Sequence, residues 1–170
     1  MIIGNFIKGI ELENRNHYFS GLCFDSSKCK KDNIFFAIKG TKIDGNRFIN
    51  HAIQKGAKII ISNQQFEGIR KKILFIKSHN VRKFLSEFAH VIYKNKPKNI
   101  IAVTGTNGKS SVADFYFQIL RLNKKKVASI GTLGIKTQNY IKKVSNTTID
   151  PITLSKILNR LKKEKINNVI

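Results

Sequence analysis

The chain has 170 residues and a formal net charge of +22, from 32 Lys and Arg against 10 Asp and Glu. It has no apolar run of about 18 residues and no basic, apolar and small-residue leader, so we expect a soluble cytoplasmic protein. The only cysteines are Cys23 and Cys29, with no further Cys or His pair at zinc spacing. A disulfide or metal role is therefore not expected, and a reducing compartment is favoured.

The positive charge alone is typical of nucleic-acid-binding proteins. The lysines, however, are spread along the whole chain, and only short clusters such as residues 124–126 occur. No interleaved aromatic residues form a base-stacking surface. Lysine, isoleucine and asparagine are abundant together, which an A/T-rich genome explains without any binding role. We therefore expect no specific nucleic-acid partner.

Residues 1–96 are predicted to form a small N-terminal α/β domain. Its expected elements are strands at 18–24, 34–38, 58–62 and 73–76, a short helix ending at Gly56, and a helix capped by Asn80. The β-branched run at 58–62 is typical of a buried parallel strand. Residues 94–98 are charged and contain a proline, which indicates a linker.

Residues 97–170 are predicted to begin a second α/β domain. Strands are expected at 99–104, at 127–131 and from 168 onward, with helices after residue 108 and after the Asp150-Pro151 cap. Alternating strands and helices predict a parallel sheet covered by helices. The first of these helices has apolar residues at helical spacing: Val112, Phe115, Tyr116, Ile119 and Leu120.

A glycine turn between the first strand and helix of this domain is the candidate nucleotide site. Its glycines let the backbone approach phosphate oxygens closely, and the following helix N-terminus is partly positive. Lys109 is the candidate catalytic cation for the β- and γ-phosphates, and Ser110 is the candidate Mg²⁺ ligand. Val103 stands where the usual phosphate-loop pattern has glycine. The expected ATP-binding residues are Gly105, Thr106, Asn107, Gly108, Lys109, Ser110 and Ser111.

This loop resembles that of the Mur ligases, the ATP-dependent enzymes that build the peptide stem of peptidoglycan. The resemblance extends to 24–28 and 31–49, which are similar to the family's Asp-Ser-Arg and Gly-Asp-Leu-Phe-Val-Ala segments. Downstream, residues 131–134 and 146–148 resemble the member that adds the third residue of the stem. The similarity covers essentially the whole chain.

The resemblance implies an amide ligase that uses ATP and Mg²⁺. ATP would phosphorylate the terminal carboxylate of UDP-MurNAc-L-Ala-D-Glu, and a diamino acid, taken as meso-diaminopimelate, would attack the acyl phosphate. The UDP end would contact Phe24, Ser26, Thr41, Lys42 and Ile43, and the MurNAc-dipeptide would contact Asn146, Thr147 and Thr148. Ser27 stands where the family has arginine. No membrane partner is implied, and the full-length enzyme would be a monomer.

From the residues alone, several of these positions have simpler interpretations. Ser26 fits a turn hydroxyl beside Asp25, and Thr147-Thr148 fit the start of a helix. Asp114 fits a solvated helix face. His17, His51, His79 and His90 are expected to have surface or structural roles, and none is proposed as catalytic.

The resemblance also implies segments that this sequence lacks, including a Glu-Val-Ser-Ser-His segment and a C-terminal amino-acid-binding domain. We therefore expect an N-terminal fragment that is poorly stable and inactive alone. The alternatives are a Mur ligase that adds D-Ala-D-Ala, a non-catalytic remnant that binds nucleotide or UDP-sugar, and a basic nucleic-acid-binding protein.

Overall fold

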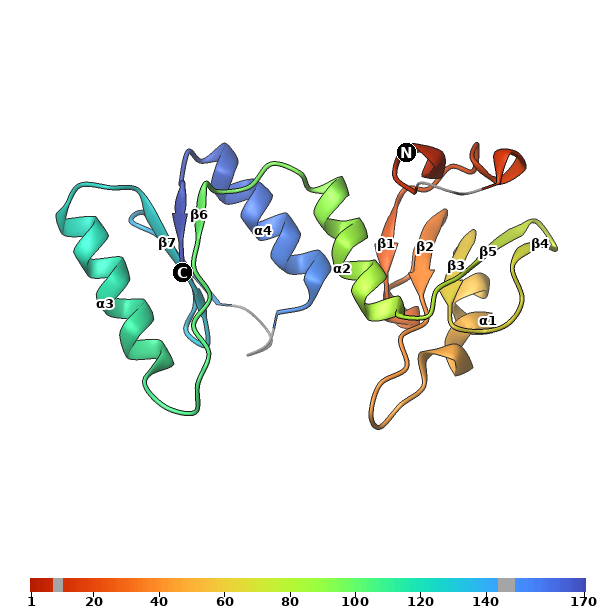
Figure 1. Cartoon of the computed structure of the whole chain (residues 1–170), viewed down its shortest axis with the longest axis horizontal. Coiled ribbons are helices and arrows are strands. Elements are labelled where there is room, and N and C mark those ends of the chain that lie inside the picture. Colours follow the sequence, from red (N-terminus) through yellow and green to blue (C-terminus); the bar gives the residue numbers. More distant parts are fainter. Residues whose placement is uncertain (8–10, 144–148) are drawn as a thin grey trace. The chain divides into compact units, whose positions relative to one another are not determined.

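The computed structural model describes residues 1–7, 11–143 and 149–170, which form two compact units, Met1–Ile92 and Tyr93–Ile170 (Figure 1). Within the described residues, each unit contains a five-stranded mixed sheet with a parallel core and with helices packed on it. The predicted α/β class is therefore confirmed. Within the described part of the chain, no helix is long and apolar enough to cross a membrane.

The sheet of the first unit has the strand order β1-β2-β3-β5-β4, and only β4 is antiparallel to its neighbour. Its strands are β1 (Gly21–Cys23), β2 (Asn33–Phe36), β3 (Ile59–Ser62), β4 (Gly68–Arg70) and β5 (Ile73–Lys77). Its helices are α1 (Ile49–Gln54) and α2 (Val81–Ile92). The described residues of this unit also form 3-10 turns: η1 (Ile3–Asn5), η2 (Leu12–Asn14), η3 (Ser26–Lys28) and η4 (Gly45–Phe48).

Both faces of this sheet are covered, which explains why every residue of β2 and β3 is buried and why most of them are apolar. On one face, α2 contributes Phe84 and Phe88 to a group of aromatic rings that includes Phe36 of β2. On the other face, α1 buries Ala52 in a cluster with Phe35. The Asn80 cap is confirmed, because its Oδ1 accepts from Lys83 N at 2.9 Å.

The expectation that the cysteines remain unpaired is wrong. Cys23, at the end of β1, forms a disulfide with Cys29, and the two Cα atoms are 5.6 Å apart. The η3 turn between them reverses the chain and brings both side chains into the buried cluster beneath α1. A Cα separation of this size is ordinary for a disulfide. Spacing in the sequence could not reveal it, because a pair six residues apart meets only when the intervening segment folds back.

The sheet of the second unit has the order β6-β10-β7-β8-β9. Strands β6, β10 and β7 are parallel, β8 is antiparallel to β7, and β9 is antiparallel to β8. Its strands are β6 (Asn99–Ile100), β7 (Val127–Gly131), β8 (Gly134–Lys136), β9 (Ile141–Lys142) and β10 (Asn168–Val169). Its helices are α3 (Lys109–Leu122) and α4 (Pro151–Lys163). The strand predicted at 99–104 is limited to its first two residues. The Asp150 cap of α4 is confirmed by a 2.9 Å bond from Thr153 N.

Helices α3 and α4 lie on opposite faces of this sheet (Figure 1). The α4 face carries the larger core, where Leu158 and Leu161 pack with Ala128 and Val169. On α3 only Phe117 is buried. Most of the predicted apolar positions of α3 are instead exposed: Val112, Phe115 and Ile119.

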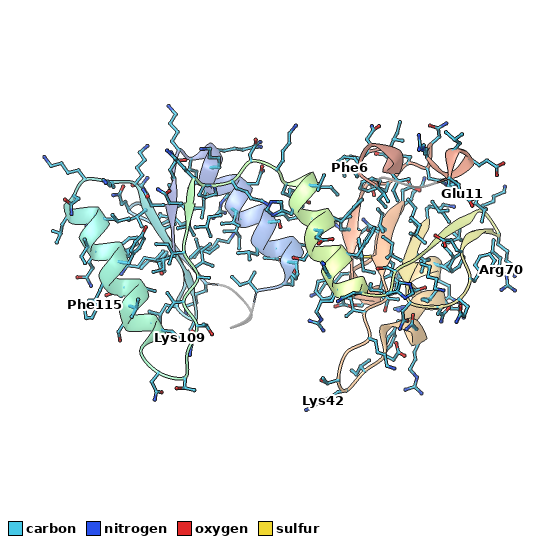
Figure 2. The ribbon with its side chains drawn as sticks, in the orientation of Figure 1. Phe6, Glu11, Lys42, Arg70, Lys109 and Phe115 are labelled. Carbon is cyan, nitrogen blue, oxygen red and sulfur yellow. A yellow bond between two sulfur atoms is a disulfide. The ribbon has the colours of Figure 1, made fainter. Side chains whose placement is uncertain are left out.

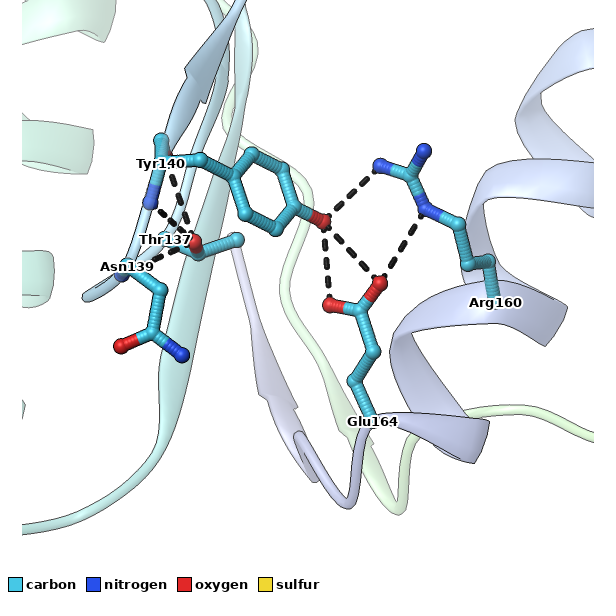
Figure 3. A network of polar contacts seen from close by, with 5 residues as sticks. All are labelled: Thr137, Asn139, Tyr140, Arg160 and Glu164. Atoms are coloured by element: carbon cyan, nitrogen blue, oxygen red, sulfur yellow. Dashed lines mark hydrogen bonds and ion pairs between the residues drawn. The ribbon is translucent and has the colours of Figure 1, made fainter.

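A polar network ties the β8–β9 turn to the C-terminal end of α4 (Figure 3). Arg160 Nη2 donates to Tyr140 Oη at 2.8 Å, and Tyr140 Oη donates to Glu164 Oε2 at 3.0 Å. Arg160 Nε also lies 3.3 Å from Glu164 Oε1. Burial and the bond to Glu164 raise the pKa of Tyr140. The network lies where α4 ends and β10 begins, at the amino edge of the parallel strands.

Candidate functional site

The predicted phosphate loop follows β6 at the carboxyl edge of the second sheet, where ligands of open α/β sheets bind. Gly105 has φ +146° and Gly108 has φ +78°, both in the region that favours glycine. A Cβ built on Gly108 meets nothing within 4 Å, so the glycine is required by the backbone conformation and not by crowding. Residues 104–111 are exposed, and the first turn of α3 contains no acidic residue.

Lys109 is the first residue of α3, where the loop meets the helix (Figure 2), and its ammonium group contacts the loop backbone. Nζ donates to the carbonyl oxygen of Gly105 and to that of Thr106, the latter at 3.2 Å. Ser110 follows in the same helical turn. The loop therefore combines a cation, a hydroxyl and a partly positive helix N-terminus, which together suit a polyphosphate.

Asp114 lies on a partly solvated face of α3, as expected, and it also joins this helix to β8. Its Oδ1 accepts from Lys136 Nζ of β8 at 2.7 Å, and its Oδ2 accepts from Gln118. The Lys136 ammonium also lies 4.6 Å from the ring centre of Phe117. The bond from Lys136, followed by that from Gln118, lowers the pKa of Asp114.

The predicted contacts of the UDP end lie at the carboxyl edge of the first sheet. Residues 24–26 follow β1, and residues 41–43 follow β2, so the parallel strands bring both segments to one edge. Phe24 and Ile43 are exposed, while Ser26 is buried. Figure 2 shows Lys42 at the tip of the long loop after β2. This edge is again the expected ligand position of a parallel sheet.

The loop after β2 is closed by its own bonds and held to the next strand. Gly40 N donates to Ile43 O at 2.9 Å, and Asp44 Oδ1 accepts from Asn46 N at 2.9 Å. Asn46 Nδ2 in turn donates to Asn63 Oδ1 at 2.8 Å, directly after β3. Asn46 and Asn63 were not predicted, because nothing in the sequence links two positions 17 residues apart.

Ser26 is held from two sides. Asp25 caps η3, the turn that begins at Ser26, by accepting from Ser27 N at 3.0 Å and from Ser27 Oγ at 2.7 Å. The bond from the Ser27 hydroxyl is the main cause that lowers the pKa of Asp25. The Ser26 Oγ lies 2.9 Å from Nδ1 of His51 on α1. His51 is a third residue whose place at this edge the sequence did not indicate.

The predicted residues thus fall into two groups. Those at 105–111 lie in the second unit, and those at 24–26 and 41–43 lie in the first. Asn146, Thr147 and Thr148 lie outside the described residues.

Comparison with known proteins gives two family matches. Residues 18–93 match the Mur ligase family, catalytic domain, and residues 103–170 match the Mur ligase middle domain. A UDP-N-acetylmuramoyl-L-alanyl-D-glutamate–2,6-diaminopimelate ligase from Rickettsia prowazekii is 41% identical over 156 residues, which are 89% of this chain and 32% of that protein. The ligase of the same name from Buchnera aphidicola is 38% identical over 159 residues, with the same coverage.

Solved structures share the fold. A structure of a UDP-N-acetylmuramoyl-L-alanyl-D-glutamate–2,6-diaminopimelate ligase matches 99% of this chain and 35% of its own, with a TM-score of 0.78 at 23% identity. A MurF ligase from Thermotoga maritima in complex with ADP matches 79% of this chain and 28% of its own, with a TM-score of 0.54 at 20% identity. The chain spans about a third of the length of the relatives it matches.

Proposed function

Because the chain belongs to the Mur ligase family, we propose that it works as part of an ATP-dependent ligase that adds meso-diaminopimelate to UDP-MurNAc-L-Ala-D-Glu in the cytoplasm. The observation that carries the proposal is the exposed loop ending in Gly108-Lys109-Ser110 at the start of α3. The relatives named for this reaction, at 38–41% identity, support the choice of substrate.

The second unit is proposed to hold the ATP phosphates. Backbone N–H groups of 105–111 would donate to phosphate oxygens. Lys109 would leave the two loop carbonyls that it contacts and would instead neutralise charge on the phosphoryl group being transferred. The open space beside Gly108 fits close approach of a phosphate. The chain needs no nucleophile of its own for this transfer, because phosphoryl transfer depends mainly on positioning and charge neutralisation.

Ser110 is proposed as the one Mg²⁺ ligand of the loop. A hydroxyl beside polyphosphate oxygens is a donor set that Mg²⁺ accepts, with the remaining positions taken by phosphate and water. Among the described residues there is no cluster of three or more acidic, His or Cys side chains that could form a cage for a metal by itself. The bound ion would neutralise charge on the transferring phosphate.

The first unit is proposed to hold the UDP end of the substrate. Ser26 would offer its hydroxyl, Phe24 an exposed ring, and residues 41–43 the rim of the loop after β2. Asn146, Thr147 and Thr148 remain proposed contacts of the MurNAc-dipeptide. Asn46 donates hydrogen bonds to Asp44 and Asn63 that fix the loop after β2, which supports a preorganised rim.

Calorimetric titration of the 170-residue chain tests these assignments. Wild type is expected to bind UDP-MurNAc-L-Ala-D-Glu and MgATP. Lys109→Ala should weaken MgATP at least about tenfold, since one charge-assisted contact contributes roughly 1.5–3 kcal/mol, and should leave the UDP ligand unaffected. Ser26→Ala should do the reverse. Lys125→Ala removes an exposed lysine of equal charge and serves as the control.

Failure of wild type to bind either ligand would contradict the proposal. Tighter binding of the tripeptide-bearing UDP substrate than of the dipeptide would favour the D-Ala-D-Ala-adding ligase. If the protein expressed from the complete reading frame binds both ligands but forms no amide bond, that result would favour a non-catalytic remnant.

A further inference from the structure

We propose that His51 is a positioning residue that orients the Ser26 hydroxyl for a uridine diphosphate ligand. This inference rests on the proposed function of the first unit and adds a residue to it. His51 is not part of the motifs that carry the family resemblance, and it is argued here only from its contact with Ser26.

The geometry joins two elements that are separate in the sequence. Ser26 opens η3 after β1, and His51 lies on α1, 25 residues later. The ring Nδ1 and the Ser26 Oγ are 2.9 Å apart, a normal hydrogen-bond length. The neighbour of His51, Ala52, is fully buried and fixes α1 against the same cluster that contains the Cys23–Cys29 disulfide.

Ser26 is therefore fixed in its backbone as well as in its side chain. Its carbonyl oxygen accepts from Cys29 N at 3.3 Å, and only 8% of the residue is exposed. A hydroxyl that lacked the histidine would rotate between several orientations. Ordering such a group is part of the entropic cost of binding, and a group ordered in advance does not incur that cost.

The chemistry of the contact leaves capacity for a ligand. A serine hydroxyl has one donor and two acceptor sites, and a ring nitrogen uses one of them. When Nδ1 accepts, both acceptor sites of Oγ remain, which suits an imide N–H of uracil. When Nδ1–H donates, the hydroxyl proton remains for a uracil carbonyl or a diphosphate oxygen. In both tautomers the His51 ring fixes the orientation of the Ser26 hydroxyl.

Titration of wild type and variants with UDP-MurNAc-L-Ala-D-Glu tests the proposal. His51→Ala is expected to raise the dissociation constant about 3- to 10-fold, the range for one neutral hydrogen bond. His51→Asn places an amide group near the position of Nδ1 and should restore affinity to within about twofold of wild type. His90→Ala removes an exposed histidine from α2 and should change nothing.

A double-mutant cycle separates positioning from a general structural effect. In a Ser26→Ala background, His51→Ala should cause no further loss, because its only proposed partner is gone. The inference would be overturned if the affinity losses of the two single variants multiplied in the double variant. It would also be overturned if His51→Ala bound the ligand with wild-type affinity. Where His51→Ala fails to fold by circular dichroism, the restored affinity of His51→Asn and its coupling to Ser26→Ala decide the question in the same way.

The outcomes also separate this inference from the proposed function. Wild type that does not bind the UDP ligand removes the proposed role of the first unit, and this inference with it. If wild type binds the UDP ligand and both His51→Ala and His51→Asn bind it with the same affinity as wild type, the proposed function stands and only the role of His51 is removed. MgATP binding is expected to be the same in all these variants.

Discussion

Asp114 and Lys136 connect the helix behind the phosphate loop to strand β8 by a 2.7 Å ion pair. The bond from Lys136 is the largest cause that lowers the pKa of Asp114 below its ordinary value. A carboxyl whose folded-state pKa is lowered stabilises the fold at pH values above its unfolded pKa, about 3.9 for aspartate. That stabilisation is lost as the pH falls through the lower, folded-state pKa.

We predict that Asp114→Asn lowers the free energy of unfolding at pH 7 and that the difference from wild type shrinks below about pH 4. Urea unfolding followed by circular dichroism at a series of pH values measures this. Glu87→Gln is the control, because the Lys83–Glu87 pair is exposed and 3.9 Å long and should contribute little. A difference for Asp114→Asn that stays constant down to pH 2 would contradict the assignment.

At the scale of single residues, the sequence could predict the groups that act through a local motif. Lys109 and Ser110 follow from a strand, two glycines and a helix that are contiguous in the chain. The partners that orient side chains could not be predicted. His51 meets Ser26 across 25 residues, and Lys136 meets Asp114 across 22, so both contacts exist only after the elements pack. Their site roles stay predictions until ligands are titrated.

Helix α3 illustrates what hydrophobic periodicity can and cannot predict. The spacing of apolar residues predicted a helix, and a helix spans Lys109–Leu122. It did not predict which side is buried, because apolar residues occur around most of the helix. Phe117 is 1% exposed against the sheet, whereas Phe115 is 63% exposed and lies on the outer side of α3 (Figure 2).

Two matched substitutions test this assignment of faces. Phe117→Ala is expected to cost about 3–5 kcal/mol of unfolding free energy, the range for a fully buried aromatic residue. Phe115→Ala should change it by no more than about 0.5 kcal/mol, as for other exposed positions. Chemical denaturation of both variants gives the comparison. Equal losses would mean that α3 buries its outer face as well.

Some short strands are a second feature that the sequence could not predict. β4 has three residues and β9 has two, so neither is long enough to show alternation or a β-branched run. Both are recognisable only from their neighbours, β5 and β8. The longer strands at 59–62, 73–77 and 127–131 were predicted within a residue of their observed ends, since most residues in each segment are apolar.

The charge of +22 belongs to the molecule as a whole and to no single patch named above. We predict that mixed-sequence DNA binds at low salt and is released as salt rises, because contacts to 6–10 phosphates lose roughly 10³–10⁵ in affinity between 50 and 200 mM salt. Fluorescence anisotropy with two unrelated DNA sequences measures this. A sequence-dependent complex that persists at 200 mM salt and is not displaced by UDP-MurNAc-L-Ala-D-Glu would instead support a nucleic-acid-binding protein.

The position of β10 between β6 and β7 has a consequence for how the protein is made. In the described part of the sheet, β6 pairs only with β10, and Asn99 Nδ2 donates to Asn168 Oδ1 across 69 residues of sequence. At about 5–20 residues per second, a ribosome needs roughly 3–14 s to synthesise that interval. During this time the strand that leads into the phosphate loop has no neighbour. The nucleotide site is therefore among the last parts of this unit to be completed, whereas every pairing of the first sheet is already available.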